Sequence, residues 1–267
     1  MLLVLSPAKS LDFESPLPAL ETTVPQFLDD SSILNQALRK LTPDDLSVLM
    51  SISSNLGELN FERNLNWSLP FTSHNARPAI FAFTGDVYTG LEVKSFCQQD
   101  LDYAQQHLRI LSGLYGVLRP LDLIQAYRLE MGTALQQGKL KSLYAFWGTR
   151  LADNLRNCLQ ADPRPFLVNL ASTEYFRAVN EKSLTYPVIS PVFKDYKNGQ
   201  FKIISFFAKK ARGRMASFLI RNRVQSVDDL KQFCADGYQY SSRDSTPESP
   251  VFLRRQVWYE DTYSPPW

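Results

Sequence analysis

The sequence predicts an α+β fold, a single compact domain in which helices surround a central mixed sheet. The chain has 267 residues, of which 44% are hydrophobic, enough to bury a large core. Short apolar runs alternate with helical patterns over the first two thirds, and β-rich runs then flank Asn198-Gly199. With no internal repeat and no long linker, we expect one domain over residues 1–258 and an irregular tail over 259–267.

The first part of the chain contains two predicted strands and two predicted helices. Leu2 to Leu5 is a short apolar run that ends at Ser6-Pro7, as expected of a buried, central strand. Residues 26–41 have leucines at helical spacing, and Thr42-Pro43 then provides a cap and a first-turn proline for a second helix. Ala79 to Phe83 is the second predicted strand, and it leads into a turn-rich segment with Gly85 and Gly90.

The rest of the chain is predicted to contain a helix, a third strand, a hairpin and further helices. The predicted elements are a helix from about Asp100 toward Leu111, a strand over 166–170, a helix after Ser172, an antiparallel hairpin near 188–207, helices over 208–223 and 227–233, and a late strand over 251–258. Residues 236–250 are predicted to be irregular.

Composition excludes several classes of protein. The net charge is +2, too small to indicate a nucleic-acid binder unless the cations are segregated. Three distant cysteines and two histidines argue against a disulfide framework, a zinc knot and a histidine-rich iron site, so we expect no metal site and no cofactor. Without a signal-like or membrane-spanning apolar run, we expect a cytoplasmic protein with no membrane partner.

Cations are segregated between Asp195 and Asp228, where no acidic residue occurs. In a helix over 208–223, one face would be buried while several cations line up on another. Such a helix could neutralise several DNA phosphates, or it could be an ordinary solvated face. The cations of this segment are Lys197, Lys202, Lys209, Lys210, Arg212, Arg214, Arg221 and Arg223.

Gly113-Leu114-Tyr115-Gly116 offers a second possible phosphate contact. Glycines in the hairpin of a helix-hairpin-helix let backbone N–H groups approach a phosphate, and such a motif near residues 100–130 would include Arg119. That motif spaces its glycines two apart, whereas Gly113 and Gly116 are three apart. A helix cap followed by a turn is the alternative.

Polar residues follow the predicted strands and form a candidate pocket. Ser6 and Lys9 follow the first strand, Asp86 and Tyr88 the second, and Asn169 ends the third. In α/β proteins, ligands bind beyond the carboxyl ends of strands. These side chains could supply a nucleophile, an acid/base pair or hydrogen bonds to a base or sugar. Helix capping by Ser6 and backbone capping by Asp86 are the structural alternatives.

Several ordered segments together resemble the YaaA peroxide-stress family. They include Leu3-Val4-Leu5-Ser6-Pro7-Ala8-Lys9-Ser10-Leu11-Asp12, Phe83-Thr84-Gly85-Asp86-Val87-Tyr88-Thr89-Gly90-Leu91, Ser112-Gly113-Leu114-Tyr115-Gly116-Val117-Leu118-Arg119-Pro120 and Ala208-Lys209-Lys210-Ala211-Arg212-Gly213. The similarity extends over residues 1 to about 240. It implies a cytosolic protein that limits iron-dependent damage by hydrogen peroxide and binds DNA through a basic cleft and a helix-hairpin-helix.

We therefore expect a DNA-binding protein with little sequence specificity that protects against oxidative damage. The expected DNA-binding residues are Lys209, Lys210, Arg212, Arg214, Arg221, Gly113, Gly116 and Arg119. The alternative is an enzyme acting on a nucleobase, nucleotide or nucleic acid through Ser6, Lys9, Asp86, Tyr88 and Asn169. No residue is assigned a catalytic role, and the oligomeric state is left open.

Overall fold

A five-stranded sheet lies at the centre of the computed structural model, which describes residues 1–255. Its strand order is β4-β3-β1-β6-β7, with β1 parallel to both β3 and β6 and with β4 antiparallel to β3. All four residues of β1 are buried, so the predicted central strand is confirmed. The strands are β1 (Leu2–Leu5), β3 (Leu108–Ser112), β4 (Gly116–Leu118), β6 (Leu167–Asn169) and β7 (Val188–Ile189).

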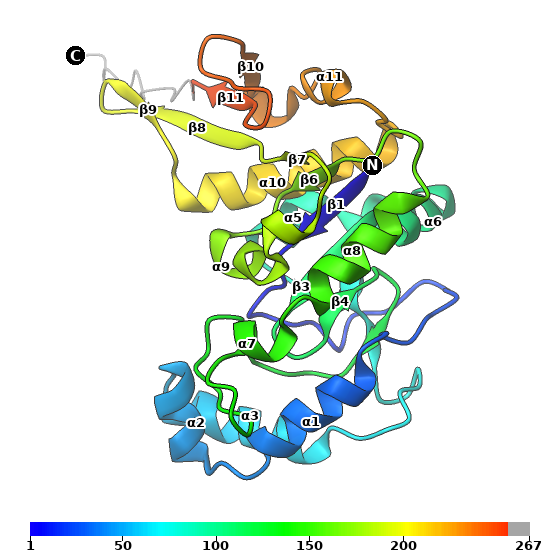
Figure 1. Ribbon diagram of the computed structural model, residues 1–267, viewed down its shortest axis with the longest axis vertical. Helices are drawn as coiled ribbons and strands as arrows, with labels where there is room; N and C mark the ends of the chain where they lie inside the picture. Colours follow the sequence, from blue (N-terminus) through cyan, green and yellow to red (C-terminus); the bar gives the residue numbers. More distant parts are fainter. Residues whose placement is uncertain (256–267) are drawn as a thin grey trace, which may run out of the picture.

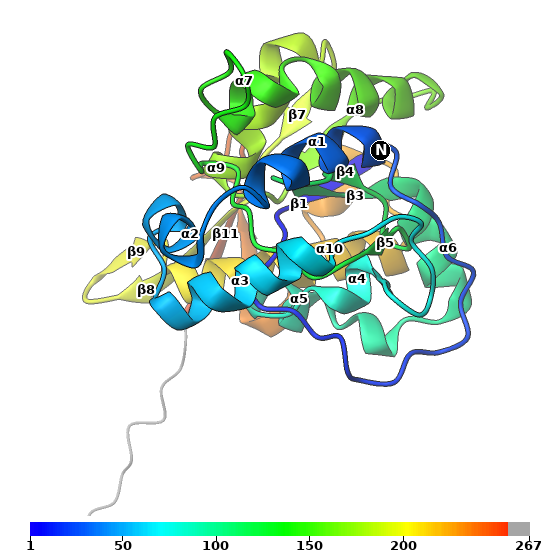
Figure 2. The same ribbon diagram turned by 90° about the horizontal axis from the view of Figure 1, so that it is seen from below.

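Helices cover both faces of this sheet (Figures 1 and 2). The helix α8 lies on one face, while α5, α6 and α10 lie on the other, and α10 packs along α5. The α10 residues Ala208, Ala211, Met215 and Leu219 are buried as the helical pattern predicted. These helices are α5 (Asp86–Leu91), α6 (Gln98–His107), α8 (Arg150–Gln160) and α10 (Ser205–Arg221).

A helical layer at the lower end of Figure 1 contains α1, α2, α3 and α7. The helix α2 begins with a capping box, in which the Thr42 hydroxyl and the Asp45 carboxylate satisfy each other's backbone N–H groups. The bounds are α1 (Leu28–Leu38), α2 (Pro43–Met50), α3 (Ser54–Asn66) and α7 (Leu143–Trp147), with α4 (Ala79–Ala82) beside the two-stranded pair β2 (Arg77–Pro78) and β5 (Leu123–Ile124).

A second, four-stranded sheet with the order β10-β11-β8-β9 packs against α10 at the upper end of Figure 1. Asn198 and Gly199, both at positive φ, turn the chain between β8 and β9, as the sequence predicted. The strands are β8 (Val192–Lys197), β9 (Gln200–Lys202), β10 (Gln239–Ser241) and β11 (Val251–Arg254); the remaining helices are α9 (Thr173–Phe176), α11 (Val227–Leu230) and the 3₁₀ turns 93–95, 177–179, 181–183 and 235–237.

The predicted α+β class is confirmed, but several predicted elements differ in type or extent. The apolar run Ala79 to Phe83, predicted as a strand, forms the short helix α4. The prediction was wrong because a buried apolar run of this length has no periodicity that distinguishes a helix from a strand. The predicted strand over 201–207 ends at Lys202, where the chain leaves the second sheet and enters α10 at Ser205. Residues 239–241 of the predicted irregular segment form a strand. The predicted tail over 259–267 and the last residues of the predicted strand 251–258 lie outside the described residues.

The predicted helix-hairpin-helix is absent from residues 100–130. The helix α6 ends at His107, and Gly113 to Gly116 joins the antiparallel strands β3 and β4. Both glycines are buried: a Cβ on Gly113 would lie 2.2 Å from the Leu129 carbonyl oxygen, and a Cβ on Gly116 would lie 2.8 Å from Trp147. These glycines therefore allow close packing of the turn between β3 and β4.

Candidate anion-binding cavity

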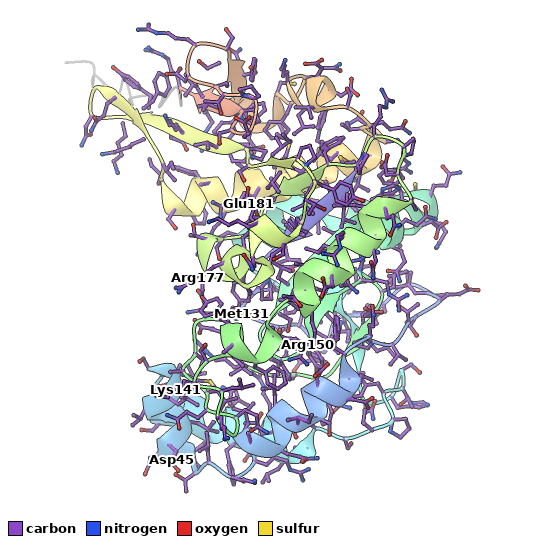
Figure 3. The ribbon with its side chains drawn as sticks, in the orientation of Figure 1. Asp45, Met131, Lys141, Arg150, Arg177 and Glu181 are labelled. Carbon is purple, nitrogen blue, oxygen red and sulfur yellow. The ribbon has the colours of Figure 1, made fainter. Side chains whose placement is uncertain are left out.

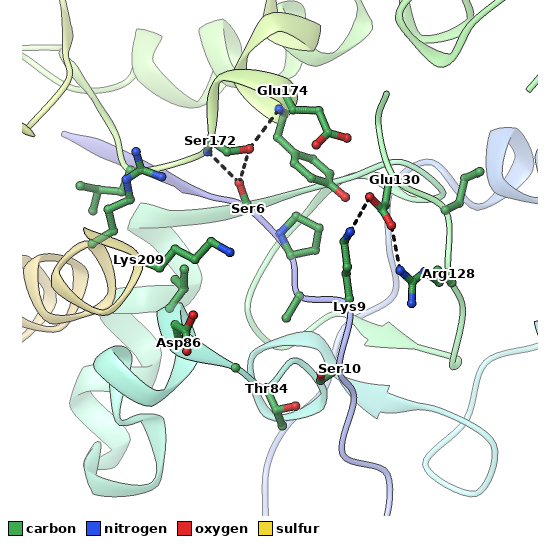
Figure 4. Close-up of a pocket in the computed structure, with 18 of the residues that line it drawn as sticks. Ser6, Lys9, Ser10, Thr84, Asp86, Arg128, Glu130, Ser172, Glu174 and Lys209 are labelled. Atoms are coloured by element: carbon green, nitrogen blue, oxygen red, sulfur yellow. Dashed lines mark hydrogen bonds and ion pairs between the residues drawn. The ribbon is translucent and has the colours of Figure 1, made fainter. Parts of the chain in front are cut away.

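A cavity of about 520 Å³ opens beyond the carboxyl ends of β1 and β6 (Figure 4). The strand β1 pairs with β3 on one side and β6 on the other, which makes this edge a topological switch point, the usual location of ligands in open parallel sheets. The cavity is lined by residues from five segments: 6–10, 84–87, 127–130, 170–175, and Lys209 with Arg212.

The floor of the cavity is fixed by hydrogen bonds to Ser6. The Ser172 backbone N–H donates to Ser6 Oγ at 2.8 Å, and the Ser6 hydroxyl lies 3.3 Å from Ser172 Oγ. The Tyr88 hydroxyl donates to the Ser6 carbonyl oxygen at 3.0 Å. Burial raises the pKa of Tyr88 well above its usual value, so this phenol remains a neutral donor. Ser6 and Tyr88 thereby join β1, α5 and the start of α9.

One wall carries a network of ion pairs. Lys9 Nζ lies 2.9 Å from Glu130 Oε2, and Arg128 lies 3.1 Å from the other oxygen of Glu130. The Glu174 carboxylate accepts a hydrogen bond from the Gly132 backbone N–H at 2.9 Å. Figure 4 shows Lys9, Glu130 and Arg128 on the side of the cavity opposite Lys209 and Asp86. Lys9 and Arg128 therefore share the single carboxylate of Glu130.

The opposite wall is formed by α10. Some cations of this helix line the cavity, and others pair with acidic residues. Lys209 and Arg212 line the cavity, and neither forms a salt bridge with a carboxylate of residues 1–255. Lys210 lies 3.6 Å from Asp236, and Arg214 pairs with Glu92 and Asp236. Arg212 is half-buried, and burial lowers the pKa of its guanidinium, which remains charged at neutral pH.

The predicted DNA-binding residues consequently do not share one surface. Of the eight, Lys209 and Arg212 line the cavity. Arg221 donates to the Ser95 carbonyl oxygen at 2.9 Å, and Arg119 pairs with Asp122 at 2.9 Å beside a different, smaller cavity. Because helical residues three apart share a face, Lys209 and Arg212 point together, while the neighbouring Lys210 and Arg214 point toward acids.

The candidate pocket residues are brought together in part. Ser6, Lys9 and Asp86 line the cavity. Tyr88 lies behind it, and Asn169 is turned away, with its side-chain oxygen accepting from the Ala171 N–H and its amide 3.3 Å from Ser190 Oγ. Ser172 and Glu174, which follow the third predicted strand, also reach the cavity.

Sequence reasoning missed Glu130 and the proximity of α5 to α10. Glu130 lies in an irregular segment, so no helical or strand periodicity indicates which residues it contacts. Gly90 and Gly213 could have indicated that α5 and α10 lie close together, because a glycine inside a helix often marks a close backbone approach. A Cβ on Gly213 would lie 1.8 Å from the Val87 carbonyl oxygen.

The fold and cavity define a class of α+β protein with a polar cavity, lined in part by cations, at the switch point of its sheet. Residues 1–244 match the family described as peroxide stress protein YaaA, and the chain belongs to this family. It is 53% identical over 256 residues to a UPF0246 protein of Shewanella amazonensis, covering 96% of this chain and 100% of that protein. A UPF0246 protein of Aliivibrio fischeri is 52% identical, with 96% and 99% covered.

Proposed function

We propose that this peroxide stress protein binds DNA with little sequence specificity and so limits iron-dependent oxidative damage to it. The observation that supports the proposal is the presence on the α10 wall of the cavity of two cations, Lys209 and Arg212, that form no salt bridge with an acidic residue of 1–255. Cations of this kind contact the phosphate backbone, which carries no sequence information. The proposed contact centre is therefore the mouth of the cavity, and Lys210 and Arg214 are excluded from it by their acidic partners.

Binding of duplex and bubble DNA at several salt concentrations tests this proposal. The variant Lys209→Gln/Arg212→Gln is expected to weaken binding at each salt concentration and to reduce the slope of log affinity against log salt by about 2, because two phosphate contacts are lost. The control is Lys139→Gln/Lys141→Gln, which removes the same charge from an exposed loop at the lower end of the molecule; Figure 3 labels Lys141. Equal losses in both variants would contradict the proposal.

An enzyme acting on a nucleobase or nucleotide is the second candidate, because Ser6, Lys9 and Asp86 line one cavity. Ser6 is held by Ser172 and Lys9 is paired with Glu130, so Asp86 is the residue of the three that is available as an acid or base. Incubation with nucleosides and nucleotides, followed by chromatography and mass spectrometry, tests this role. Turnover that Asp86→Asn abolishes would support it, and the absence of any product would exclude these substrates.

A further inference from the structure

The surroundings of Arg212 indicate the charge of the ligand that this cavity accepts. The guanidinium is half-buried and forms no salt bridge within the described part of the chain. A cation that is partly removed from water is unfavourable unless an anion or a hydrogen-bond acceptor compensates it. The four other cations between Lys210 and Arg254 that occupy partly or fully buried positions have such partners: Lys210, Arg214, Arg223 and Arg254 each lie beside a carboxylate.

The backbone that carries Arg212 is closely packed. Gly90 and Gly213 bring α5 and α10 into backbone contact, with a Cβ on Gly90 only 2.1 Å from the Lys210 carbonyl oxygen. Lys209 and Arg212 are one helical turn apart on α10, so both project from a fixed wall. The planar guanidinium can bind two oxygens of one phosphate while the ammonium contacts a third. This geometry suits a compact oxyanion with several oxygens.

The other groups in the cavity indicate what the anion is attached to. Asp86 lines the same cavity, lies on the same side as Lys209 in Figure 4, and forms no salt bridge with any residue of 1–255. A carboxylate beside an anion site can accept hydrogen bonds from sugar hydroxyls. The volume of about 520 Å³ is larger than a single phosphate needs. Tyr127 and Tyr175 add aromatic surface to the lining.

We propose that the cavity binds a sugar phosphate monoester, with its phosphate on Arg212 and Lys209 and a sugar hydroxyl on Asp86. This inference deepens the proposed function, because the same two cations serve both. The monoester can come from a free mononucleotide or from the 5′-phosphorylated end of a DNA strand. A phosphodiester within an intact strand has no terminal phosphate and is therefore not the proposed ligand.

Isothermal titration with inorganic phosphate, ribose 5-phosphate and 5′-AMP tests the site without DNA. Ribose 5-phosphate and 5′-AMP are expected to bind more tightly than phosphate. Arg212→Gln is expected to weaken all three by about tenfold or more, since it removes a charge-assisted contact. Asp86→Asn is expected to weaken ribose 5-phosphate severalfold while leaving inorganic phosphate equal or tighter, because a nearby negative charge is removed. Lys139→Gln/Lys141→Gln is the control and is expected to match the unmodified protein.

Two duplexes of identical sequence, one with 5′-phosphate ends and one with 5′-hydroxyl ends, distinguish the source of the ligand. A preference for the phosphorylated duplex that Arg212→Gln removes identifies DNA ends, whereas binding of 5′-AMP without such a preference identifies the free nucleotide. No binding of the three small phosphates and no preference between the duplexes would overturn the inference. If duplex binding still depended on Lys209 and Arg212 in that case, the proposed function would be supported although the further inference is overturned.

Discussion

At the scale of single residues, Asp195 is a deeply buried partner in an ion pair that joins the strands β8 and β11. Its side chain is 2% exposed, and its two oxygens accept hydrogen bonds from Arg254 Nε at 2.6 Å and from the Tyr238 hydroxyl at 2.8 Å. Arg254 also lies over the rings of Phe207 and Tyr238. The pair therefore links β8 and β11 to the first turn of α10.

Asp195→Ala is expected to lower the free energy of unfolding by about 3–5 kcal/mol, because it leaves the Arg254 guanidinium buried without a counterion. Urea denaturation measures the change. Asp228→Ala is the control, because Asp228 is 83% exposed in its pair with Lys231 and its loss should change stability little. A small effect of Asp195→Ala, equal to that of the control, would contradict the assigned role.

His107 gives the stability of the protein a specific dependence on pH. Burial lowers the pKa of His107 from its usual value of 6.5, and its Nδ1 lies 2.8 Å from the Met1 carbonyl oxygen. The unfolded chain therefore binds a proton at a higher pH than the folded one. The free energy of unfolding should fall as the pH drops from 6.5 through the lower pKa of the folded state.

Denaturant unfolding between pH 7 and about 5 measures this slope. His107→Gln is expected to flatten it, while His74→Gln, at an exposed position, leaves it unchanged. An unaltered slope in His107→Gln would assign the pH dependence to other groups.

At the scale of secondary structure elements, the contact between α5 and α10 positions the cavity. Gly213 packs against the Val87 carbonyl oxygen, and Gly90 packs against Lys210. The end of α5 that carries Asp86 is thereby held near the α10 residues Lys209 and Arg212.

Gly213→Ala is expected to destabilise the protein by about 1–3 kcal/mol, because the added methyl would meet backbone atoms that cannot move aside easily. Thermal denaturation gives the loss, and Ser217→Ala, also buried on α10, adds no Cβ and serves as the control. The same substitution should weaken phosphate binding, since it separates the two walls. An unchanged stability of Gly213→Ala would contradict this prediction, because it would show that α5 and α10 can move apart with no loss in the free energy of unfolding.

Local sequence signals predicted most elements but failed where burial is complete. Thr42 and Ser172, which precede predicted helices, accept backbone N–H groups as caps, and Ser226 does the same at the start of α11. Leu108 to Ser112 instead continues the apolar pattern of α6 and was predicted as helix, although it forms a buried parallel strand. A strand buried on both faces shows no alternation of apolar and polar residues, so its conformation is decided by pairing with its neighbours β1 and β4.

At the scale of the whole molecule, α10 lies between the central sheet and the second sheet. It packs against α5 and α6 on one side and against β8 on the other. Among residues 1–255, no helix is both long and apolar enough to cross a bilayer. The expectation of one domain over residues 1–258 remains a prediction, and the shared helix is its physical basis.

Hydrogen exchange in increasing denaturant tests this prediction. Amides of β1 and of β8 are expected to be exposed with the same free energy of opening, because unfolding of either sheet removes the packing of α10. Opening of β8, β9, β10 and β11 at a lower free energy than β1 would instead define a separate unit.

The sequence by itself determined the α+β class, the central first strand, the Asn198-Gly199 hairpin and the helical caps, because each depends on periodicity or on contacts within a few residues. It also identified the acid-free cationic segment and the polar residues that follow the strands. Only the tertiary structure decided which cations remain available: Glu92 and Asp236, more than 20 positions from Arg214 in the chain, neutralise it, while Arg212 on the same helix lines a cavity. Charge compensation depends on distances in space, and these are set by packing between elements far apart in the sequence.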